Sequence, residues 1–548
     1  MTFIKLFEKS FRENFDIPAL SDYGTNVNYT YGALAKEIAK LHILFKQCGL
    51  KEGDKISLVG KNTTNWGIVH LATFTYGAVI VPILQEFNSR DISQIINHSD
   101  SLLLFCSDSI WNTLDRDMFP ELKGTFSLNN FRLLYQREGE NISHYLSQID
   151  AQFDEKYPEG FASRHINYSD LSNDKVIVLN YTSGTTGFSK GVMITGNNLS
   201  GNMDFAENSF HLKTGDHMLS FLPLAHTYGI AFDFFYALST GCNVTLLGKT
   251  PAPKILLKAF EEVNPKLIIS VPLIFEKIYK KMIIPLLGKK PIKLALRISL
   301  LDKQIYAKIK KKLVKAMGGK FTQVIIGGAA FNNEAEDFLL KIKFPVSVGY
   351  GMTECAPLIS FSLCKNFVPH SCGKVLDCMQ VRIDSEDPYN VAGEIQVKGQ
   401  NVMLGYYKNE EATRMVFTDD GWLKTGDLGT IDEDNNIFIR GRSKSMILGP
   451  SGQNIYPEEI ESKLNNLPYV MESLALEKNK RLVALVFPDC DAMEKAGISS
   501  EELPAIMEEN KEILNKLIAS YEKISEIQLY PNEFEKTPKK SIKRYLYT

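Results

Sequence analysis

The stretch VIVLNYTSGTTGFSKGV, residues 176–192, carries the two signals on which the fold and the site both depend. Its first four residues are an apolar run of the length of a buried strand, and a loop rich in Ser, Thr and Gly follows closely. Glycines let backbone N–H groups turn toward one point, hydroxyls add donors, and a lysine adds a full positive charge, which together suit a polyphosphate. The predicted phosphate-binding residues are Thr182, Ser183, Gly184, Thr185, Thr186, Gly187 and Lys190.

The spacing in this loop differs from that of a Walker A loop, because Ser189 rather than a glycine precedes Lys190. An ordinary solvated loop is the alternative, since Ser, Thr and Gly are common in such loops. The position of the whole pattern directly after a buried strand favours the phosphate site.

Similar apolar runs alternate with helical patterns on both sides of this stretch. Each run is short and is followed within two residues by Gly, Ser or Asn, as buried strands often are. The predicted strands are Ile56–Val59, Leu102–Phe105, Val176–Leu179, Val244–Leu247, Leu267–Ile269 and Val324–Ile326, and the predicted helices include Tyr31–Phe45, Ile92–Ile96 and Ile255–Val263. This alternation indicates βαβ units with parallel sheets, and therefore the α/β class.

The pattern changes from about Val375, where shorter alternating strands with turn residues indicate a small β subdomain over about 375–441. A second change comes after GRSKS, residues 441–445. Beyond it we expect an acidic helix, a strand, a charged helix and a basic tail, at Pro457–Leu464, Leu482–Phe487, Ser500–Leu517 and the last residues respectively. The predicted organisation is a large N-terminal domain, 1–441, and a small α+β C-terminal domain, 442–548.

The totals exclude several classes of protein. At 548 residues and 44% hydrophobic content the chain is expected to form at least two globular domains. Its 62 basic and 64 acidic residues give a net charge of −2, so the chain as a whole has no attraction for nucleic acid or anionic membrane, and any phosphate binding must be local.

Targeting signals are weak or lacking in the sequence. The start, MTFIKLFEKSFRENF, lacks the continuous apolar core of a signal peptide. The best transmembrane candidate is Trp66–Leu84, but polar residues and Pro82 interrupt it, so we expect a buried helix that leads into a strand.

Eight cysteines lie singly without a CxxC pair, which favours the reducing cytoplasm, and Cys355 is expected to be a small buried residue. The sequence is compatible with peripheral contact of the protein with a membrane.

A second chemical motif, GYGMTE, occupies residues 349–354 and comes after a predicted strand at Phe344–Val348. Open α/β sheets bind ligands at the carboxyl ends of their strands. There, Tyr350 and Gly351 suit stacking on a base and a close backbone approach, Thr353 suits donation to a phosphate, and Glu354 suits Mg²⁺. Taken alone, the motif is also compatible with an ordinary turn. The interpretation as a ligand site depends on the phosphate-loop motif at 181–191.

Four motifs occur in one order along the chain: YTSGTTGFSKGV, GYGMTE, TGDLG and GRSKSMI with SGQNIYPEEIE. In this order they resemble those of the AMP-binding acyl-CoA synthetase superfamily over nearly the whole length. The resemblance implies an N-terminal domain of two stacked βαβ-type sheets with the β subdomain, a mobile C-terminal lid, and the substrates ATP with Mg²⁺, a carboxylic acid and CoA. The segments LPLAHTYG, VPLIFEKIY and GEIQVKGQNVMLGYYKNEEAT look most like long-chain fatty acid CoA ligases.

The resemblance also implies roles for single residues. Gly328, Ala329 and Ala330 match the segment that lines the adenine pocket, where small residues permit close backbone approach. Asp427 matches the carboxylate that holds both ribose hydroxyls, and Arg442 matches a ribose and phosphate contact.

Further positions carried over from the family concern the acid and the lid. His226 in LPLAH matches a residue beside the phosphates and the mouth of the acyl tunnel, although a lone histidine is more often a core residue. Lys444 falls at the hinge, and the Ser451-Gly452 loop would guide CoA. The apolar stretch Tyr228–Leu238 fits an acyl pocket or the core equally well.

The end of the chain departs from the family pattern. In EKTPKKSIKR, Ser541 stands where the family has the lysine that reaches the bridging oxygen during adenylation. Lys540, or Lys539 as a less favoured substitute, is expected to deliver that charge, and merely solvated lysines are the alternative. Two other functions stay open at this point: loading an acyl carrier protein in place of free CoA, and catalytically silent nucleotide binding.

Overall fold

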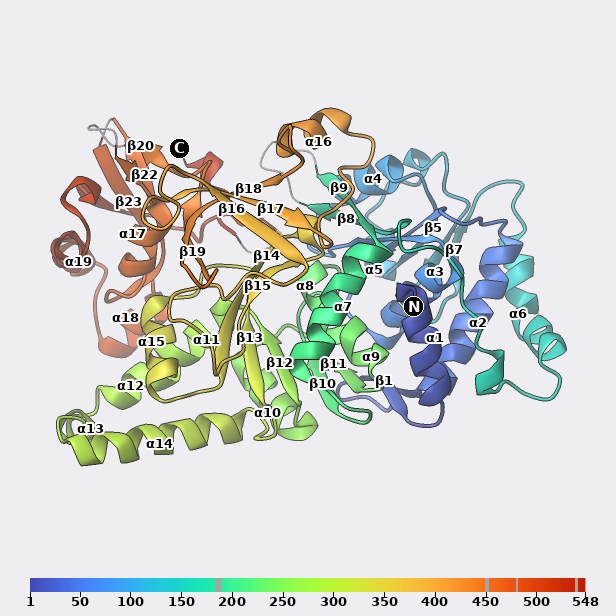
Figure 1. The fold of residues 1–548 in the computed structure, drawn as a ribbon, viewed down its shortest axis with the longest axis horizontal. Coiled ribbons are helices and arrows are strands. Elements are labelled where there is room, and N and C mark those ends of the chain that lie inside the picture. Colours follow the sequence, from blue (N-terminus) through green and yellow to red (C-terminus); the bar gives the residue numbers. More distant parts are fainter. Residues whose placement is uncertain (183–188, 449–452, 480, 538–540, 548) are drawn as a thin grey trace. The chain divides into compact units, whose positions relative to one another are not determined.

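The computed structural model describes residues 1–182, 189–448, 453–479, 481–537 and 541–547 (Figure 1). The chain divides into two compact units. The first contains Met1–Thr182, Ser189–Gln380 and Lys398–Gly421, and the second contains Val381–Val397 and Trp422–Thr548. This division crosses the expected β subdomain, while the domain boundary at 441/442 and the hinge at Lys444 stay predictions.

A seven-stranded sheet with the order β7-β6-β5-β3-β4-β8-β9 is the largest in the first unit. Its five inner strands pair in parallel, and β7 and β9 close the two edges in antiparallel pairs. The bounds are β3 Lys55–Val59, β4 Val79–Ile83, β5 Ser101–Cys106, β6 Gly124–Ser127, β7 Leu133–Gln136, β8 Val176–Thr182 and β9 Lys190–Thr195. Strand β4 is buried along its whole length, as expected for a parallel strand between helical layers.

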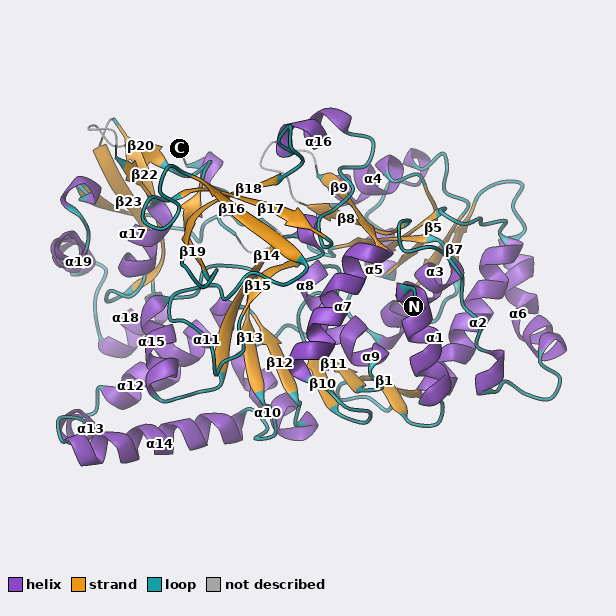
Figure 2. Ribbon diagram, in the orientation of Figure 1, coloured by secondary structure: helices purple, strands orange, loops and turns teal. Residues whose placement is uncertain are grey.

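Two four-stranded sheets complete the first unit, with the orders β10-β11-β1-β2 and β12-β13-β14-β15. The backbone N–H of Lys266 donates to the carbonyl of His217 at 2.8 Å, so the sheets adjoin at β10 and β12. The bounds are β1 Pro18–Asp22, β2 Asn28–Thr30, β10 His217–Ser220, β11 Asn243–Leu246, β12 Leu267–Ser270, β13 Gln323–Ile326, β14 Val346–Gly351 and β15 Leu358–Phe361. Strands alternate with helices throughout (Figure 2), and the predicted α/β class is confirmed.

The helices and strands expected from apolar patterns are present. Most predicted strands match an observed strand with both ends within one residue. The exceptions are β8, which continues past Leu179 to Thr182, and the strand expected at Phe344–Val348, which lies at Val346–Gly351 (β14). The predicted helices match α2 (Tyr31–Gln47), α4 (Ser89–His98) and α10 (Pro253–Val263). Helix α4 begins before its apolar pattern because the Asn88 side chain accepts from the backbone N–H of Asp91 and caps it. Apolar spacing therefore located this helix, and a capping residue set its start.

The transmembrane candidate Trp66–Leu84 forms a buried helix and a strand, as predicted. Helix α3 (Thr64–Tyr76) ends where Gly77 adopts a φ of +95°, and β4 comes at once after it. His70 of this helix is fully buried and stacks on Trp66 at a ring distance of 5.0 Å. No helix within the described residues is long and apolar enough to cross a membrane.

The apolar stretch Tyr228–Leu238 runs through three consecutive helical segments, α8 (Thr227–Gly229), η3 (Ile230–Tyr236) and α9 (Ala237–Ser239). Phe235 is fully buried and meets Phe3 and Phe7 of α1 (Phe3–Glu13) edge to face, at ring distances of 5.3 and 5.6 Å. This part of the stretch therefore belongs to the core.

A long helical crossover joins β12 to β13, as Figure 1 shows along the lower edge of the green part of the chain. Its elements are α11 Pro272–Ile278, η4 Tyr279–Ile283, α12 Ile284–Leu287, α13 Lys290–Ala295 and α14 Ser299–Ala316. The other helices of the first unit are α5 Asp108–Trp111, α6 Ile142–Lys156, α7 Gly196–Phe210, α15 Asn333–Lys341 and α16 Glu410–Val416. Because β12 and β13 are parallel neighbours, a crossover of this kind is required between them.

The second unit contains the elements expected for the small C-terminal domain. The predicted helix Pro457–Leu464 is α17, the strand Leu482–Phe487 lies in β23 (Arg481–Pro488), and α19 (Leu503–Leu517) covers most of Ser500–Leu517. Strands β22 and β23 pair antiparallel, and β23 and β24 pair in parallel. The remaining bounds are β16 Met379–Asp384, β17 Gly393–Gly399, β18 Leu423–Ile431, β19 Ile437–Arg442, β20 Ile447–Leu448, β21 Asn454–Ile455, β22 Val470–Lys478, α18 Cys490–Ala496 and β24 Glu526–Leu529.

Candidate functional site

The predicted phosphate loop is held at its base by the hairpin of β8 and β9. Thr182 and Lys190 are paired across this hairpin, one at the end of each strand. The buried Tyr181 is fixed by a hydrogen bond of 2.7 Å between its hydroxyl and Nδ1 of His98. Residues 183–187, also predicted to bind phosphate, lie outside the described residues. The hairpin therefore sets where the loop begins and ends.

The LPLAH segment is fastened beside this hairpin. The Asn180 side chain of β8 donates to the carbonyl of Ala225 at 2.9 Å, and both residues are buried. The Asn62 side chain donates to the carbonyl of Leu222 and accepts from the N–H of Leu224, at 2.7 and 3.1 Å. These contacts place the partly exposed His226, which precedes α8, close to the strand that leads into the phosphate loop.

The GYGMTE motif lies at the carboxyl end of β14, where that strand pairs with β15. Gly351 has no room for a side chain, because a Cβ there would lie 2.1 Å from the carbonyl oxygen of Pro357. The turn η5 (Thr353–Cys355) comes next, with Thr353 buried and Glu354 partly exposed. Tyr350 is 6% exposed, and its stacking on a base stays a prediction.

Tyr406 joins the two motifs through its side chain. Its hydroxyl donates to Oε1 of Glu354 at 2.9 Å, and Nζ of Lys190 lies 4.8 Å from the centre of its ring. Burial, reinforced by the Glu354 carboxylate, raises the pKa of Tyr406, so the phenol stays protonated and continues to donate. One aromatic residue thus contacts both the predicted phosphate-binding cation and the predicted metal-binding carboxylate.

The main chain around Tyr406 is held between the same two motifs. The N–H of Met403 donates to the carbonyl of Glu354, and the N–H of Tyr407 donates to the carbonyl of Gly191, both at 2.8 Å. The sequence did not single out Tyr406, although its GYYK segment belongs to one of the family patterns. Two adjacent tyrosines after a glycine are a weak signal, because nothing in the local sequence shows that one of them reaches Glu354.

The expected adenine-lining residues come directly after β13. Gly328 has a φ of +88°, a conformation that favours glycine, and a Cβ there would approach only Val271, at 3.9 Å. Gly328, Ala329 and Ala330 are all exposed. They lie at the carboxyl end of a strand that pairs in parallel with β14, the strand of the GYGMTE motif.

In the second unit, Asp427 and Arg442 face each other across β18 and β19. Their strands place them in register, and Nε of Arg442 lies 3.1 Å from Oδ1 of Asp427. The Asp427 side chain is only 9% exposed, whereas that of Arg442 is 70% exposed. The carboxylate is therefore fixed and the guanidinium projects outward.

The C-terminal part contains the residues predicted to guide CoA, to act in adenylation and to form the hinge. Ser451 and Gly452, predicted to guide CoA, and Lys539 and Lys540, predicted to act in adenylation, lie outside the described residues. Ser541 is described, and its carbonyl accepts from the N–H of Thr537 at 2.8 Å. Lys444 lies just after β19 in the same unit, and its role as a hinge stays a prediction.

Glu354 has the chemistry to hold a magnesium ion together with substrate phosphates. Mg²⁺ in nucleotide sites is commonly bound by one or two carboxylates plus phosphate oxygens. Tyr406 occupies Oε1 of Glu354 and directs the carboxylate. Among the described residues, no cluster of three or more His, Cys, Asp or Glu side chains could hold a metal ion.

Changing Tyr406 to Phe should test the link between the motifs. The variant keeps the ring beside Lys190 but removes the hydroxyl that holds Glu354 at 2.9 Å. A hydrogen bond to a charged group contributes about 1.5–3 kcal/mol, so we expect kcat to fall roughly 10- to 100-fold and the Mg²⁺ concentration for half-maximal activity to rise. Steady-state kinetics over a Mg²⁺ titration measures both.

Tyr407→Phe is the matched control for Tyr406→Phe. Its hydroxyl donates to Oδ2 of Asp100, also at 2.9 Å, so the control removes an equivalent bond to a different carboxylate. We expect Tyr407→Phe to leave the Mg²⁺ dependence unchanged. Equal Mg²⁺ curves for the two variants would contradict a positioning role for Tyr406.

The sequence is similar to a known protein family and to named proteins of other organisms. A family model described as "AMP-binding enzyme" matches residues 7–407. A long-chain-fatty-acid–CoA ligase of Mycobacterium bovis, FadD15, is 27% identical, and the match covers 95% of this chain and 90% of the relative. Long-chain-fatty-acid–CoA ligase 5 of Rattus norvegicus is 26% identical, with coverages of 97% and 84%.

Solved structures with the same fold cover essentially the whole chain. An anthranilate CoA ligase, AuaEII, in complex with anthranoyl-AMP has a TM-score of 0.79 at 17% identity, covering 100% of this chain and 96% of its own. ATP-bound MatB from Rhodopseudomonas palustris has a TM-score of 0.76 at 21% identity, with coverages of 100% and 98%. The fold is therefore that of adenylate-forming enzymes, and the predicted resemblance is confirmed. Because the family model covers most of the sequence, the chain belongs to the AMP-binding enzyme family.

Proposed function

We propose that the protein activates a carboxylic acid with ATP, forming an acyl adenylate and pyrophosphate, and then transfers the acyl group to CoA. The acid is a medium- or long-chain fatty acid. The observation that carries this proposal is the contact of Tyr406 with both Lys190 and Glu354 at the end of the β8–β9 hairpin, in a member of the AMP-binding family.

The charges of this site suit the first half-reaction. A carboxylate is a poor acyl donor because its leaving group would be oxide, and adenylation converts that oxygen into a good leaving group. The anionic acid must approach a strongly anionic nucleotide, and each pair of like unit charges near 4 Å costs about 4 kcal/mol at an effective dielectric near 20. Lys190, the loop amides and Thr353 supply donors against that repulsion.

Bound Mg²⁺ would supply further positive charge to the phosphate oxygens. The role of Glu354 in this chain is to hold that charge in a fixed place, and the role of Tyr406 is to hold Glu354. Because Glu354 and Lys190 both contact Tyr406, cation and carboxylate keep a fixed relation while substrates exchange.

The second unit is proposed to hold the sugar and to serve the thioester step. Asp427, fixed and nearly buried, has two carboxylate oxygens for the ribose hydroxyls, and the outward Arg442 suits a phosphate. Rotation of the lid about Lys444 would move the tail lysine, Lys540, away from the active site. The Ser451-Gly452 loop, which guides CoA, would then face the active site in its place. Lid motions of this kind belong to the microsecond-to-millisecond class.

The substrate class and the cellular setting are part of the same proposal. Relatives that align over nearly the whole chain are named long-chain-fatty-acid–CoA ligases, which supports a fatty acid. All eight cysteines lie within the described residues, and none of them is disulfide-bonded there. Burial raises the pKa of the Cys355 thiol well above its usual value, as expected for an inert buried residue. We place the enzyme in the cytoplasm.

The proposal is tested by measuring AMP release and ATP–pyrophosphate exchange with acids from acetate to palmitate, with and without CoA. We expect fatty acids to stimulate exchange without CoA, and AMP release to become catalytic when CoA is added. Exchange that proceeds while CoA gives no thioester would point to a carrier-protein acceptor. Failure of every acid to stimulate exchange would contradict acyl activation and leave silent nucleotide binding.

A further inference from the structure

The crossover between β12 and β13 carries a strong local charge. Residues 279–320, here called the basic segment, contain 12 lysines and one arginine but a single acidic residue, Asp302. Removing these 13 basic and one acidic residues from the chain totals of 62 and 64 leaves the rest with a net charge of −14. The near-neutral total therefore conceals a segment of net charge +12.

Four lysines of the basic segment share one face of α14. Lys308, Lys311, Lys312 and Lys315 recur at intervals of three and four residues, the spacing of one helical face, and all four are exposed. The opposite face carries three apolar residues, Ile309, Leu313 and Met317, which are 8%, 6% and 0% exposed. Helix α14 is therefore anchored by its apolar face and presents its lysines outward.

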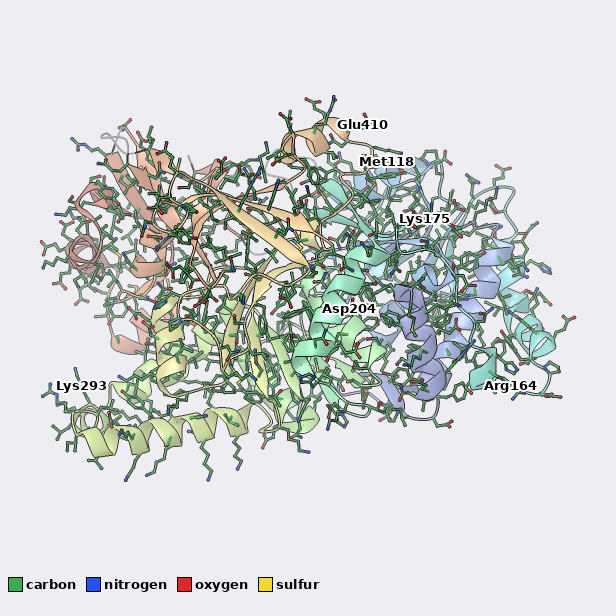
Figure 3. The ribbon with its side chains drawn as sticks, in the orientation of Figure 1. Met118, Arg164, Lys175, Asp204, Lys293 and Glu410 are labelled. Carbon is green, nitrogen blue, oxygen red and sulfur yellow. The ribbon has the colours of Figure 1, made fainter. Side chains whose placement is uncertain are left out.

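Apolar side chains are exposed within the same segment. Leu301 is 39% exposed and, at seven residues before Lys308, lies on the lysine face of α14. Large apolar residues are also exposed on the preceding elements η4, α12 and α13 and just before α14: Met282 (43%), Ile284 (43%), Leu294 (65%) and Ile298 (52%). Figure 3 labels Lys293 of α13, where other side chains also project away from the ribbon.

This arrangement is unfavourable for a helix that faces only water. Like charges three or four residues apart repel each other and destabilise a helix. The described residues provide no ion pair for any of these four lysines. A flat anionic surface would remove that repulsion. Clusters of four or more basic residues on an amphipathic helix, interspersed with exposed apolar side chains, are typical of helices that lie on anionic bilayers.

We propose that the basic segment docks the protein on the surface of a bilayer that contains anionic phospholipid. The lysine face of α14 contacts the headgroups, and the exposed apolar residues of η4, α12 and α13 enter the headgroup boundary. This surface is separate from the Lys190–Tyr406–Glu354 cluster, and the inference does not depend on the proposed reaction. The exposed apolar residues favour lipid over nucleic acid, because phosphate contacts to nucleic acid require only charge.

The experiment measures cosedimentation of the full-length protein with vesicles of phosphatidylglycerol and phosphatidylcholine, and with phosphatidylcholine alone. We expect binding to the anionic vesicles only, weakened by salt. Changing Lys308, Lys311, Lys312 and Lys315 together to Gln should lower the partition coefficient roughly 10²- to 10³-fold, since each lysine near such a surface contributes about a factor of five.

A second set of four substitutions provides the matched control. Lys9, Lys46, Lys51 and Lys156 are exposed elsewhere in the first unit, so their change to Gln removes the same charge without touching α14. Equal loss of binding in the two sets would overturn the proposal, as would equal binding to both vesicle types.

The exposed apolar residues are tested separately from the lysines. The pair Leu294→Ser and Ile298→Ser should also weaken vesicle binding, because both side chains are more than half exposed in the basic segment. Full binding by that pair, with equally tight binding of the wild type to duplex DNA, would assign the surface to nucleic acid instead.

Discussion

Replacing Glu354 by Gln should lower fatty-acid-dependent ATP–pyrophosphate exchange roughly 10²- to 10³-fold, the usual cost of losing a principal electrostatic group at a transition state. The amide can still accept from Tyr406, so the turn keeps its hydrogen bond of 2.9 Å while the negative charge that would hold Mg²⁺ is lost. The measurement is exchange at saturating acid, repeated over a range of Mg²⁺ concentrations.

Glu410→Gln is the control for charge alone. Glu410 begins α16 in the same unit and is exposed, at the upper edge of Figure 3. We expect this variant to match the wild type, because its carboxylate contacts neither Lys190 nor Tyr406 in the described residues. Exchange by Glu354→Gln within about threefold of the control would remove Glu354 from the mechanism.

Replacing Gly351 by Ala should damage both folding and activity. The new Cβ would lie 2.1 Å from the Pro357 carbonyl oxygen, which already accepts from the N–H of Met352 at 2.8 Å. The chain must move to relieve the overlap, and such overpacking costs about 1–3 kcal/mol. Since Met352 leads directly into Thr353 and Glu354, we expect activity per folded molecule to fall by roughly 10-fold or more.

Thermal unfolding and pyrophosphate exchange on the folded fraction separate the two effects of Gly351→Ala. Gly288→Ala is the matched control, because a Cβ at Gly288 would meet its nearest atom, the carbonyl oxygen of Ile284, at an ordinary 3.5 Å. We expect that control to keep its melting temperature and its activity. A Gly351→Ala protein that is as stable and as active as the control would show that this backbone can shift without moving Glu354.

The two motifs could be located from the sequence, but the residue that joins them could not. Apolar runs and a Ser/Thr/Gly loop depend on local chain order, so the strand before Thr182 and the turn at Glu354 were both predictable. Tyr406 lies 52 residues after Glu354 and 216 after Lys190, and its role depends on contacts that close only when three segments pack together. Asn180 and Asn62, which fasten the LPLAH segment, could not be predicted for the same reason.

The sequence by itself determined the α/β class, the family and the residue types that can bind a nucleotide, because apolar periodicity and short motifs are properties of neighbouring residues. Tertiary structure alone decided that Phe235 is core, that Tyr406 holds Glu354, and that four lysines of α14 share an exposed face. These depend on which surfaces are buried and which distant side chains meet. The net charge of −2 is a sum over the whole chain, in which the acidic remainder offsets the basic segment. Composition therefore gave no sign of that segment.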